Sequence, residues 1–191
     1  MSADGSPGAD GLDGKRLLAL ARAAIAERFG GPKVQRPPRQ SWLDQPRAVF
    51  VTLKIEGELR GCIGQLVARL PLFEAVQEAA RSAAFTDPRF SPLQPEELPR
   101  VRIDVSVLSP LEPLEVKDEE DLLAKLRPGV DGVVLSHEFR SGLFIPEMWK
   151  QLPEPREFIA LLKRKAGFPR HAWLPGTKVQ RFTAEHWEEA P

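Results

Sequence analysis

Four stretches of the chain place apolar residues three or four positions apart, which is the spacing of a helix with one buried face. Gly30 and Gly167 follow the last apolar positions of two of them, where glycine commonly ends a helix. Pro71 and Asp118 stand where the other two begin, because proline suits the first turn and aspartate can cap free N–H groups. The predicted helices cover residues 15–29, 71–85, 118–126 and 156–166.

Six further stretches have the alternating or β-branched apolar pattern of strands. Residues 101–107 alternate most strictly, which predicts one face on the core and the other toward water or a cleft. Residues 48–55 are apolar almost throughout, so we expect a strand covered on both faces for much of its length. Glu56-Gly57 then predicts a hairpin turn. The predicted strands cover residues 48–55, 58–65, 101–107, 132–136, 142–145 and 178–185.

Helices and hairpins that mix without regular βαβ alternation predict an α+β fold, with a mainly antiparallel sheet and flanking helices. A chain of 191 residues with 42% hydrophobic and 28% charged side chains is typical of one globular domain. Residues 1–14 hold few bulky side chains, so we expect a disordered tail there and a folded domain over residues 15–191.

Charge and cysteine content exclude several classes of protein. The 27 basic and 27 acidic side chains cancel, which argues against a general attraction to nucleic acid or to an anionic membrane. No secretory signal or bilayer-length apolar run is present, so a cytoplasmic location is the expectation. Cys62 is the only cysteine, which excludes an internal disulfide and a cysteine-rich zinc site. The sequence predicts no metal and no cofactor.

The most unusual local chemistry is the run Leu-Arg-Gly-Cys-Ile-Gly at residues 59–64. In a regular strand Arg60 and Cys62 share a face, and a guanidinium near a thiol favours the thiolate, which attacks electrophiles. Gly61 and Gly64 leave the backbone open to a ligand. We therefore predict Cys62 and Arg60 as catalytic residues, and Gly61 and Gly64 as ligand-binding residues.

Two alternatives remain for this run. A bulge at Gly61 would turn Arg60 away from the face that carries Cys62. A lone cysteine in a hairpin is also commonly a small core residue, and Arg60 would then be a surface charge.

A second group of charges brackets the end of the predicted helix 71–85. With Arg60, the residues Arg81, Asp87 and Arg89 can form a corner that binds phosphate or carboxylate. Arg81 and Arg89 are therefore candidate residues for binding a small anionic ligand. The alternative, which the Asp87-Pro88 turn signal favours, is a set of caps and ion pairs.

The three histidines lack the spacing of metal ligands. His137 is the preferred candidate for a general base that reaches Cys62 in the fold. His171 and His186 stand next to apolar residues and are assigned to packing or surface positions.

One basic cluster combines residues 163–165 with Lys178 and Arg181. We expect a solvated helix face there, because cations suit a helix C-terminus and no aromatic residues for stacking on bases are interleaved. The four tryptophans are expected to anchor packing rather than a ligand.

Taken together, the motifs resemble the AMMECR domain family, whose prokaryotic members are called the A protein of the AmmeMemoRadiSam system. The resemblance extends from about residue 15 to residue 189 and includes the Leu-Arg-Gly-Cys-Ile-Gly run. The matching segments are residues 50–53, 57–64, 71–72, 83–90, 105–108, 131–132, 141–144, 165–167 and 181–182.

This resemblance implies an α+β fold in a larger and a smaller lobe, with the Arg-Gly-Cys segment lining a cleft between them. The biochemical activity of the family is not established. Its prokaryotic members are associated with a Memo-type protein and a radical SAM protein, which implies these two as partners in a pathway acting on a nucleic acid or a small metabolite. Carried onto this chain, the family motif singles out Arg60, Gly61, Cys62 and Gly64.

Three functions follow from the sequence. The protein is an enzyme that uses the Cys62 thiolate to attack or transfer an acyl, alkyl or similar group, or a non-catalytic binding or adaptor module in which Cys62 is structural. In the third alternative, it carries a substrate for the Memo-type and radical SAM proteins.

Overall fold

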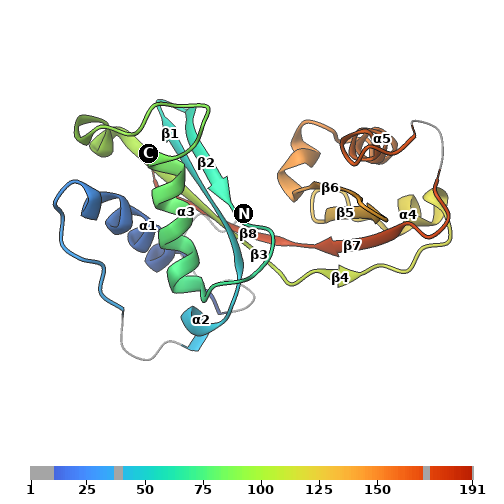
Figure 1. Ribbon diagram of the computed structural model, residues 1–191, viewed down its shortest axis with the longest axis horizontal. Coiled ribbons are helices and arrows are strands. Elements are labelled where there is room, and N and C mark those ends of the chain that lie inside the picture. Colours follow the sequence, from blue (N-terminus) through green and yellow to red (C-terminus); the bar gives the residue numbers. More distant parts are fainter. Residues whose placement is uncertain (1–10, 37–40, 170–172, 191) are drawn as a thin grey trace. The chain divides into compact units, whose positions relative to one another are not determined.

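The computed structural model describes residues 11–36, 41–169 and 173–190, which form two compact units (Figure 1). The first unit combines the described residues up to Leu108 with those from Glu185 on, and the second runs from Ser109 to Ala184. Each unit has its own four-stranded sheet and its own hydrophobic core. The α+β class is confirmed, with the antiparallel strands divided between two sheets. The cleft between lobes stays a prediction.

The first unit is a sheet in the order β2-β1-β3-β8 with two helices on one face (Figure 1). The apolar sides of these helices pack with alternate residues of the strands in one core. A short helix α2 (Ser41–Asp44) and a 3₁₀ helix at Pro95–Arg100 complete the unit. Its main elements are α1 (Gly14–Arg28), β1 (Ala48–Ile55), β2 (Glu58–Gly64), α3 (Leu72–Phe85), β3 (Val101–Leu108) and β8 (Ala184–Glu188).

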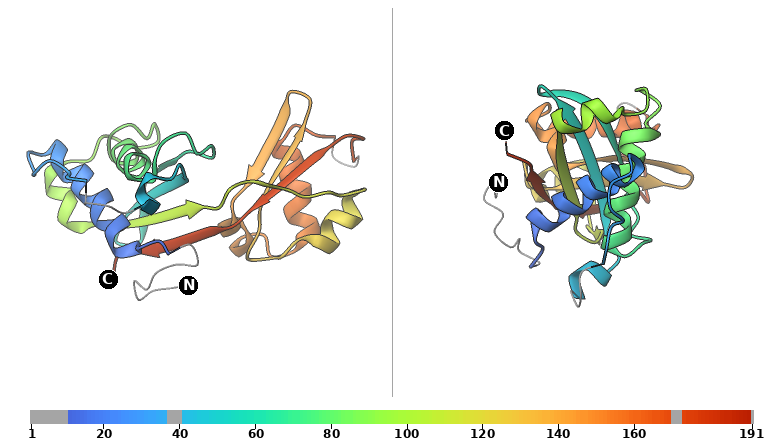
Figure 2. Two further views of the ribbon diagram at one scale, coloured as in Figure 1. Left: turned by 90° about the horizontal axis from the view of Figure 1, so that it is seen from below. Right: turned by 90° about the vertical axis from the view of Figure 1, so that its left-hand side faces the viewer.

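Only one face of β1 is fully covered. Val49 and Val51 are buried toward the helices, whereas Phe50, Thr52 and Lys54 on the opposite face are partly exposed. The expectation of a strand covered on both faces was wrong, because α1 and α3 both lie on the same side of the sheet (Figure 2). The side of this sheet away from α1 and α3 is called the polar face below.

The hairpin between β1 and β2 forms where the sequence predicted it. Glu56 and Gly57 both have positive φ angles, 54° and 85°, as a two-residue turn that follows strand twist requires. Further along, Leu53 pairs with Gly61 but Lys54 pairs with Leu59, so a bulge leaves one extra residue in β2. The extra residue is Arg60 rather than the Gly61 considered above.

The second unit has a sheet in the order β4-β7-β5-β6, with helices packed on it. The Trp149 ring stacks on Phe158 at 3.8 Å, and its indole N–H donates to the Asp131 carbonyl at 2.7 Å. This tryptophan therefore anchors the core, as expected for each of them. The elements are β4 (Glu112–Pro113), α4 (Glu119–Lys125), β5 (Gly132–His137), β6 (Arg140–Phe144), a 3₁₀ helix (Pro146–Lys150), α5 (Pro155–Lys165) and β7 (Lys178–Phe182).

The basic cluster on α5 is not a solvated face throughout. Lys163 is only 2% exposed, and its ammonium donates to Glu119 of α4 at 2.6 Å. Arg164, the next residue, is exposed. The expectation was wrong for Lys163, because α4 packs against α5 and buries that position along with the apolar residues beside it.

The last predicted strand, residues 178–185, is two strands. β7 pairs with β5 and β4 in the second unit, whereas β8 belongs to the sheet of the first unit. Thr183 lies between them, and its carbonyl accepts from Ser109 N–H at 2.9 Å. β7 buries Val179 and Phe182 in the second unit, and β8 buries Trp187 in the first.

Ordered structure begins before residue 15. Leu12 is 2% exposed, and the Asp13 carboxylate accepts from Arg16 N–H as the N-cap of α1. These residues lie inside the predicted tail 1–14, whose first ten residues fall outside the described part of the chain. No described helix combines the length and the apolar character needed to cross a membrane.

Candidate functional site around Cys62

Cys62 lies on the polar face of β2, directly opposite Thr52 of β1. The Thr52 hydroxyl donates a hydrogen bond to Sγ at 3.1 Å. Antiparallel partners whose backbone groups point away from each other hold their side chains closest, and this pair has that geometry. Cys62 is partly exposed, so its thiol is not a core side chain like those of its neighbours on β1.

The backbone of Cys62 faces the edge of the sheet, because β2 is its outermost strand. There the N–H donates to Asp87 Oδ2 at 2.8 Å, and the carbonyl accepts from Arg89 Nη2 at 3.0 Å. Asp87 and Arg89 are themselves an ion pair at 2.7 Å. This pair therefore satisfies both edge groups of Cys62, as a neighbouring strand would.

The ion pair has a marked electrostatic effect. The Arg89 hydrogen bond, helped by the backbone N–H groups of Cys62 and Arg89, holds the pKa of Asp87 far below its usual range despite burial. The hydrogen bond to Asp87 is the main reason why the pKa of Arg89 is raised, and attraction to the Cys62 side chain raises it further. Of the arginines considered above, Arg89 is therefore the one whose guanidinium contacts Cys62.

Arg60 has another partner. Its guanidinium donates twice to Glu97, at 2.8 and 3.0 Å, and this pairing lowers the pKa of Glu97. The same guanidinium lies 6.0 Å from the centre of the Phe90 ring. The bulge at Arg60 breaks the alternation on which its predicted role beside Cys62 depended.

The two glycines are required by close packing. A Cβ on Gly61 would lie 2.1 Å from the Ala83 carbonyl oxygen of α3, and one on Gly64 would lie 2.3 Å from the Val49 carbonyl oxygen. Both distances are far below contact, so any side chain would push the strand away. Their predicted role in ligand binding stays a prediction.

The anion-binding corner is only partly assembled. Arg81 donates to Glu27 of α1 and to Gln77, each at 3.1 Å, so it lies with the helices. Asp87 and Arg89 pair with each other at Cys62, which is the ion-pair alternative considered above.

Polar side chains from three strands follow Cys62 along the polar face. Asp104 of β3 is opposite Thr52 in the register, and its carboxylate lies 3.0 Å from His186 Nδ1. The Lys54 ammonium lies 3.4 Å from Asp104 and 3.0 Å from Glu188. This cluster was not predicted from the sequence, which assigned His186 to a packing or surface position. The strand register and the separate strand β8, which bring these residues together, cannot be read from the sequence.

Donor atoms of Asp104, His186 and Glu188 lie within 4.8 Å of one another, and among the described residues they are the group able to hold a metal ion. The Lys54 ammonium already balances both carboxylates there. The other two histidines are not part of this cluster: His137 lies in the second unit with Nε2 3.1 Å from the Pro175 carbonyl, and His171 lies outside the described residues.

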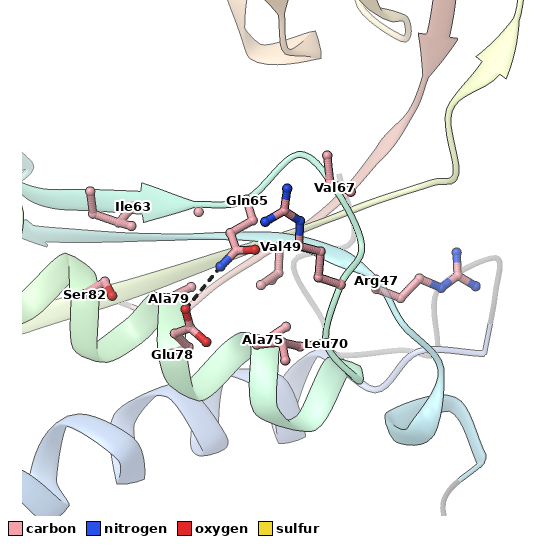
Figure 3. A pocket seen from close by; sticks show the side chains of 12 residues that line it. Arg47, Val49, Ile63, Gln65, Val67, Leu70, Ala75, Glu78, Ala79 and Ser82 are labelled. Carbon is pink, nitrogen blue, oxygen red and sulfur yellow. Dashed lines mark hydrogen bonds between the residues drawn. The ribbon is translucent and has the colours of Figure 1, made fainter.

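A pocket adjoins the end of β2 on the side of α3 (Figure 3). Val49, Ile63 and Ala79 give it an apolar floor, while Gln65 of the loop donates to Glu78 of α3 at 3.1 Å across it. Gly64 lines it as well, and its empty space is about 330 Å³, part of which opens to solvent.

The structure is that of a two-unit α+β protein in which an Asp–Arg pair holds the backbone of a partly exposed cysteine on an edge strand. Residues 18–187 match the AMMECR1 family, and the chain belongs to that family.

Its relatives carry no functional description in their names. A protein of Methanothermobacter thermautotrophicus is 41% identical over 181 residues, covering 93% of this chain and 94% of the relative. One of Thermococcus gammatolerans is 42% identical over 189 residues, covering 92% and 90%. The crystal structure of an uncharacterised protein from Pyrococcus horikoshii is similar with a TM-score of 0.78 and 38% identity, covering 92% and 91%.

Proposed function

We propose that this AMMECR1-family protein is an enzyme that acts through the Cys62 thiolate. One observation carries the proposal: the Thr52 hydroxyl donates to the thiol of a partly exposed cysteine, and the Arg89 guanidinium donates to the carbonyl of the same residue. Hydrogen bonds and positive charge both favour thiolate over thiol. The assisting cation is Arg89 in place of Arg60, whose guanidinium is engaged by Glu97.

The chemistry is nucleophilic. The thiol loses its proton to solvent or to the leaving group, Sγ forms a bond to an acyl or alkyl carbon, and the leaving group departs with the bonding electrons. Because Asp87 and Arg89 hold the backbone N–H and carbonyl of Cys62, the position from which its side chain projects is fixed during the attack. The substrate would approach over the polar face, on which the thiol lies.

Alkylation of Cys62 by iodoacetamide between pH 6 and 9, read by mass spectrometry on native and denatured protein, tests this proposal. We expect native protein to react at neutral pH and the T52V variant to react several-fold more slowly, because valine keeps the shape and removes the O–H donor. The R89M variant should also slow the reaction, whereas R81M, which breaks a pair with Glu27, should leave it unchanged.

A Cys62 that reacts only after denaturation would overturn the proposal in favour of the binding module with a structural cysteine. That alternative also predicts that Arg60→Ala abolishes capture of a partner while Cys62→Ser leaves it intact.

The pathway belongs to the same proposal. We infer that the protein works with a Memo-type and a radical SAM protein and that Cys62 holds the group passed between them. Purified C62S protein and wild type, each mixed with both partners from one organism, provide the test. A substrate adduct on wild type alone, seen by intact-mass spectrometry, supports the inference, and its absence from both contradicts it.

A further inference from the structure

We propose that the pocket at the end of β2 binds a small aliphatic carboxylate, held by the Gly64 N–H and the Arg69 guanidinium. The site lies in the first unit and does not depend on the reactivity of Cys62.

The backbone of β2 supplies the first contact. Cys62 directs its N–H and carbonyl away from β1, where Asp87 and Arg89 meet them. Backbone direction alternates along an antiparallel strand, and the pairing of β1 with β2 is regular from Gly61 to Gly64. Gly64 therefore presents its N–H and carbonyl to the same edge as Cys62, two residues further on.

No described residue accepts a hydrogen bond from the Gly64 N–H at this edge. Gln65 N–H, the next along the chain, donates to the Val49 carbonyl, which confirms that the pairing with β1 continues past Gly64. An unpaired N–H at the mouth of a pocket is an anion-binding group.

The second contact is Arg69, which lines the same pocket. Arg69 is exposed, and no ion pair or hydrogen bond engages it among the described residues. At Cys62 a carboxylate bridges a backbone N–H and a guanidinium, and that guanidinium also donates to the carbonyl of the same residue. At Gly64 the N–H, the carbonyl and the guanidinium are present, and a ligand carboxylate would take the place of Asp87.

The lining of the pocket away from Gly64 and Arg69 restricts what can follow the carboxylate in the ligand. Val49, Ile63, Leu70, Ala75 and Ala79 make its walls largely apolar. Its empty space of about 330 Å³ includes open solvent, so a bound chain would lie partly exposed along these walls. These features fit a short branched or straight aliphatic chain behind the carboxylate.

Titration of ¹⁵N-labelled protein with 4-methylpentanoate, followed by the amide resonance of Gly64, tests the site. We expect a saturable downfield shift of that resonance, and at least about tenfold weaker binding for R69Q, since a charged hydrogen bond contributes on the order of 1.5–3 kcal/mol. The A75L variant should also weaken binding by filling the apolar wall. R100Q, which removes an exposed pair with Glu56, and C62S should bind like wild type.

Three results would overturn the proposal. They are equal binding by R69Q and wild type, equal binding of 4-methylpentan-1-ol, and tighter binding of N-acetyl-leucine, which would point to a peptide C-terminus instead. Because C62S is expected to bind normally, loss of thiol reactivity and loss of this site are separate outcomes.

Discussion

Asp87 is the residue on which the geometry of Cys62 depends most. Its side chain is 1% exposed and accepts from two backbone N–H groups, those of Cys62 and Arg89, and from the Nε and Nη2 of the Arg89 guanidinium. The sequence predicted two alternative roles for Asp87, in an anion-binding corner or in a turn. In the structure it has a third role, because its carboxylate accepts from a strand-edge N–H that a neighbouring strand would otherwise pair with. Proline at position 88 supports the turn that brings Arg89 back to its partner.

Replacing Asp87 with alanine should lower the free energy of unfolding by about 2–4 kcal/mol at pH 7, because it leaves the Cys62 N–H without an acceptor and removes the carboxylate partner of Arg89. The depressed pKa of Asp87 means that its stabilisation is complete above the ordinary carboxyl pKa of about 3.9 and is lost as the pH falls toward the folded-state value. Urea unfolding from pH 7 to pH 2 should therefore show the difference from wild type shrinking below about pH 4.

The matched control is Glu120→Ala. Glu120 pairs with Arg156 on the surface, where both side chains are exposed and solvent screens the pair, so its loss should change stability very little. An Asp87 variant no less stable than this control would contradict the assigned role.

At the scale of elements, the close approach of β2 to α3 decides where Cys62 points. Gly61 allows the strand to approach the Ala83 carbonyl of the helix. Because side chains alternate between the faces of a strand, the next residue, Cys62, then points to the opposite, polar face. The glycines were predicted as an opening for a ligand, yet at Gly61 the space is filled by α3. Glycine at a strand position fits either use, and only the position of the helix distinguishes them.

Gly61→Ala should destabilise the protein by about 2–3 kcal/mol, because its Cβ would overlap the backbone of α3 and force the two elements apart. Thermal unfolding by circular dichroism measures this effect. Leu59→Ala on the same strand removes a side chain that is 42% exposed and should cost under about 1 kcal/mol. Equal effects of the two substitutions would show that β2 does not press on the helix.

Lys163 gives the corresponding test in the second unit. Lys163→Ala should cost about 2–3 kcal/mol, because it removes buried packing and the partner of Glu119. Lys163→Met keeps the packing and should lose less, and Arg164→Ala on the exposed side should change stability by no more than about 0.5 kcal/mol. Chemical denaturation would rank the free energies of unfolding of the three variants. A loss of stability in Arg164→Ala as large as that in Lys163→Ala would contradict the buried role of Lys163.

At the scale of the whole molecule, the chain returns to the first unit at its end. β8 adds the fourth strand, Trp187 is 3% exposed in the core, and Glu189 accepts from the Arg22 Nε at 2.7 Å. The first unit is therefore built from two distant parts of the sequence, and the second unit is inserted between them.

Removing residues 185–191 should strongly destabilise the first unit although only seven residues are lost. Hydrogen exchange should then show loss of protection in α1 and β3, with protection retained in β5 and β7. A chain ending at Glu189 is the control and should exchange like wild type. Equal loss of protection in both units would mean that they unfold as one.

The sequence by itself determined the local elements and the family. The helix from residue 15, the hairpin at Glu56-Gly57 and the alternating strand at 101–107 depend on periodicity and turn residues, which act over a few positions. Cys62 was predicted to be the chemical centre because its neighbours are unusual in composition, and this stays a prediction. The Leu-Arg-Gly-Cys-Ile-Gly run also carried the family resemblance, which the match over residues 18–187 bears out.

Only the tertiary structure decided the partners of Cys62. The bulge at Arg60, the turn that returns Arg89 and the register that puts Thr52 opposite the thiol depend on pairings between residues 5 to 27 positions apart. The same holds for His186 beside Asp104, which needs β8 to leave the second unit and join the first. Side-chain alternation says which residues share a face within one strand, but the register and order of strands are set by packing of the whole unit.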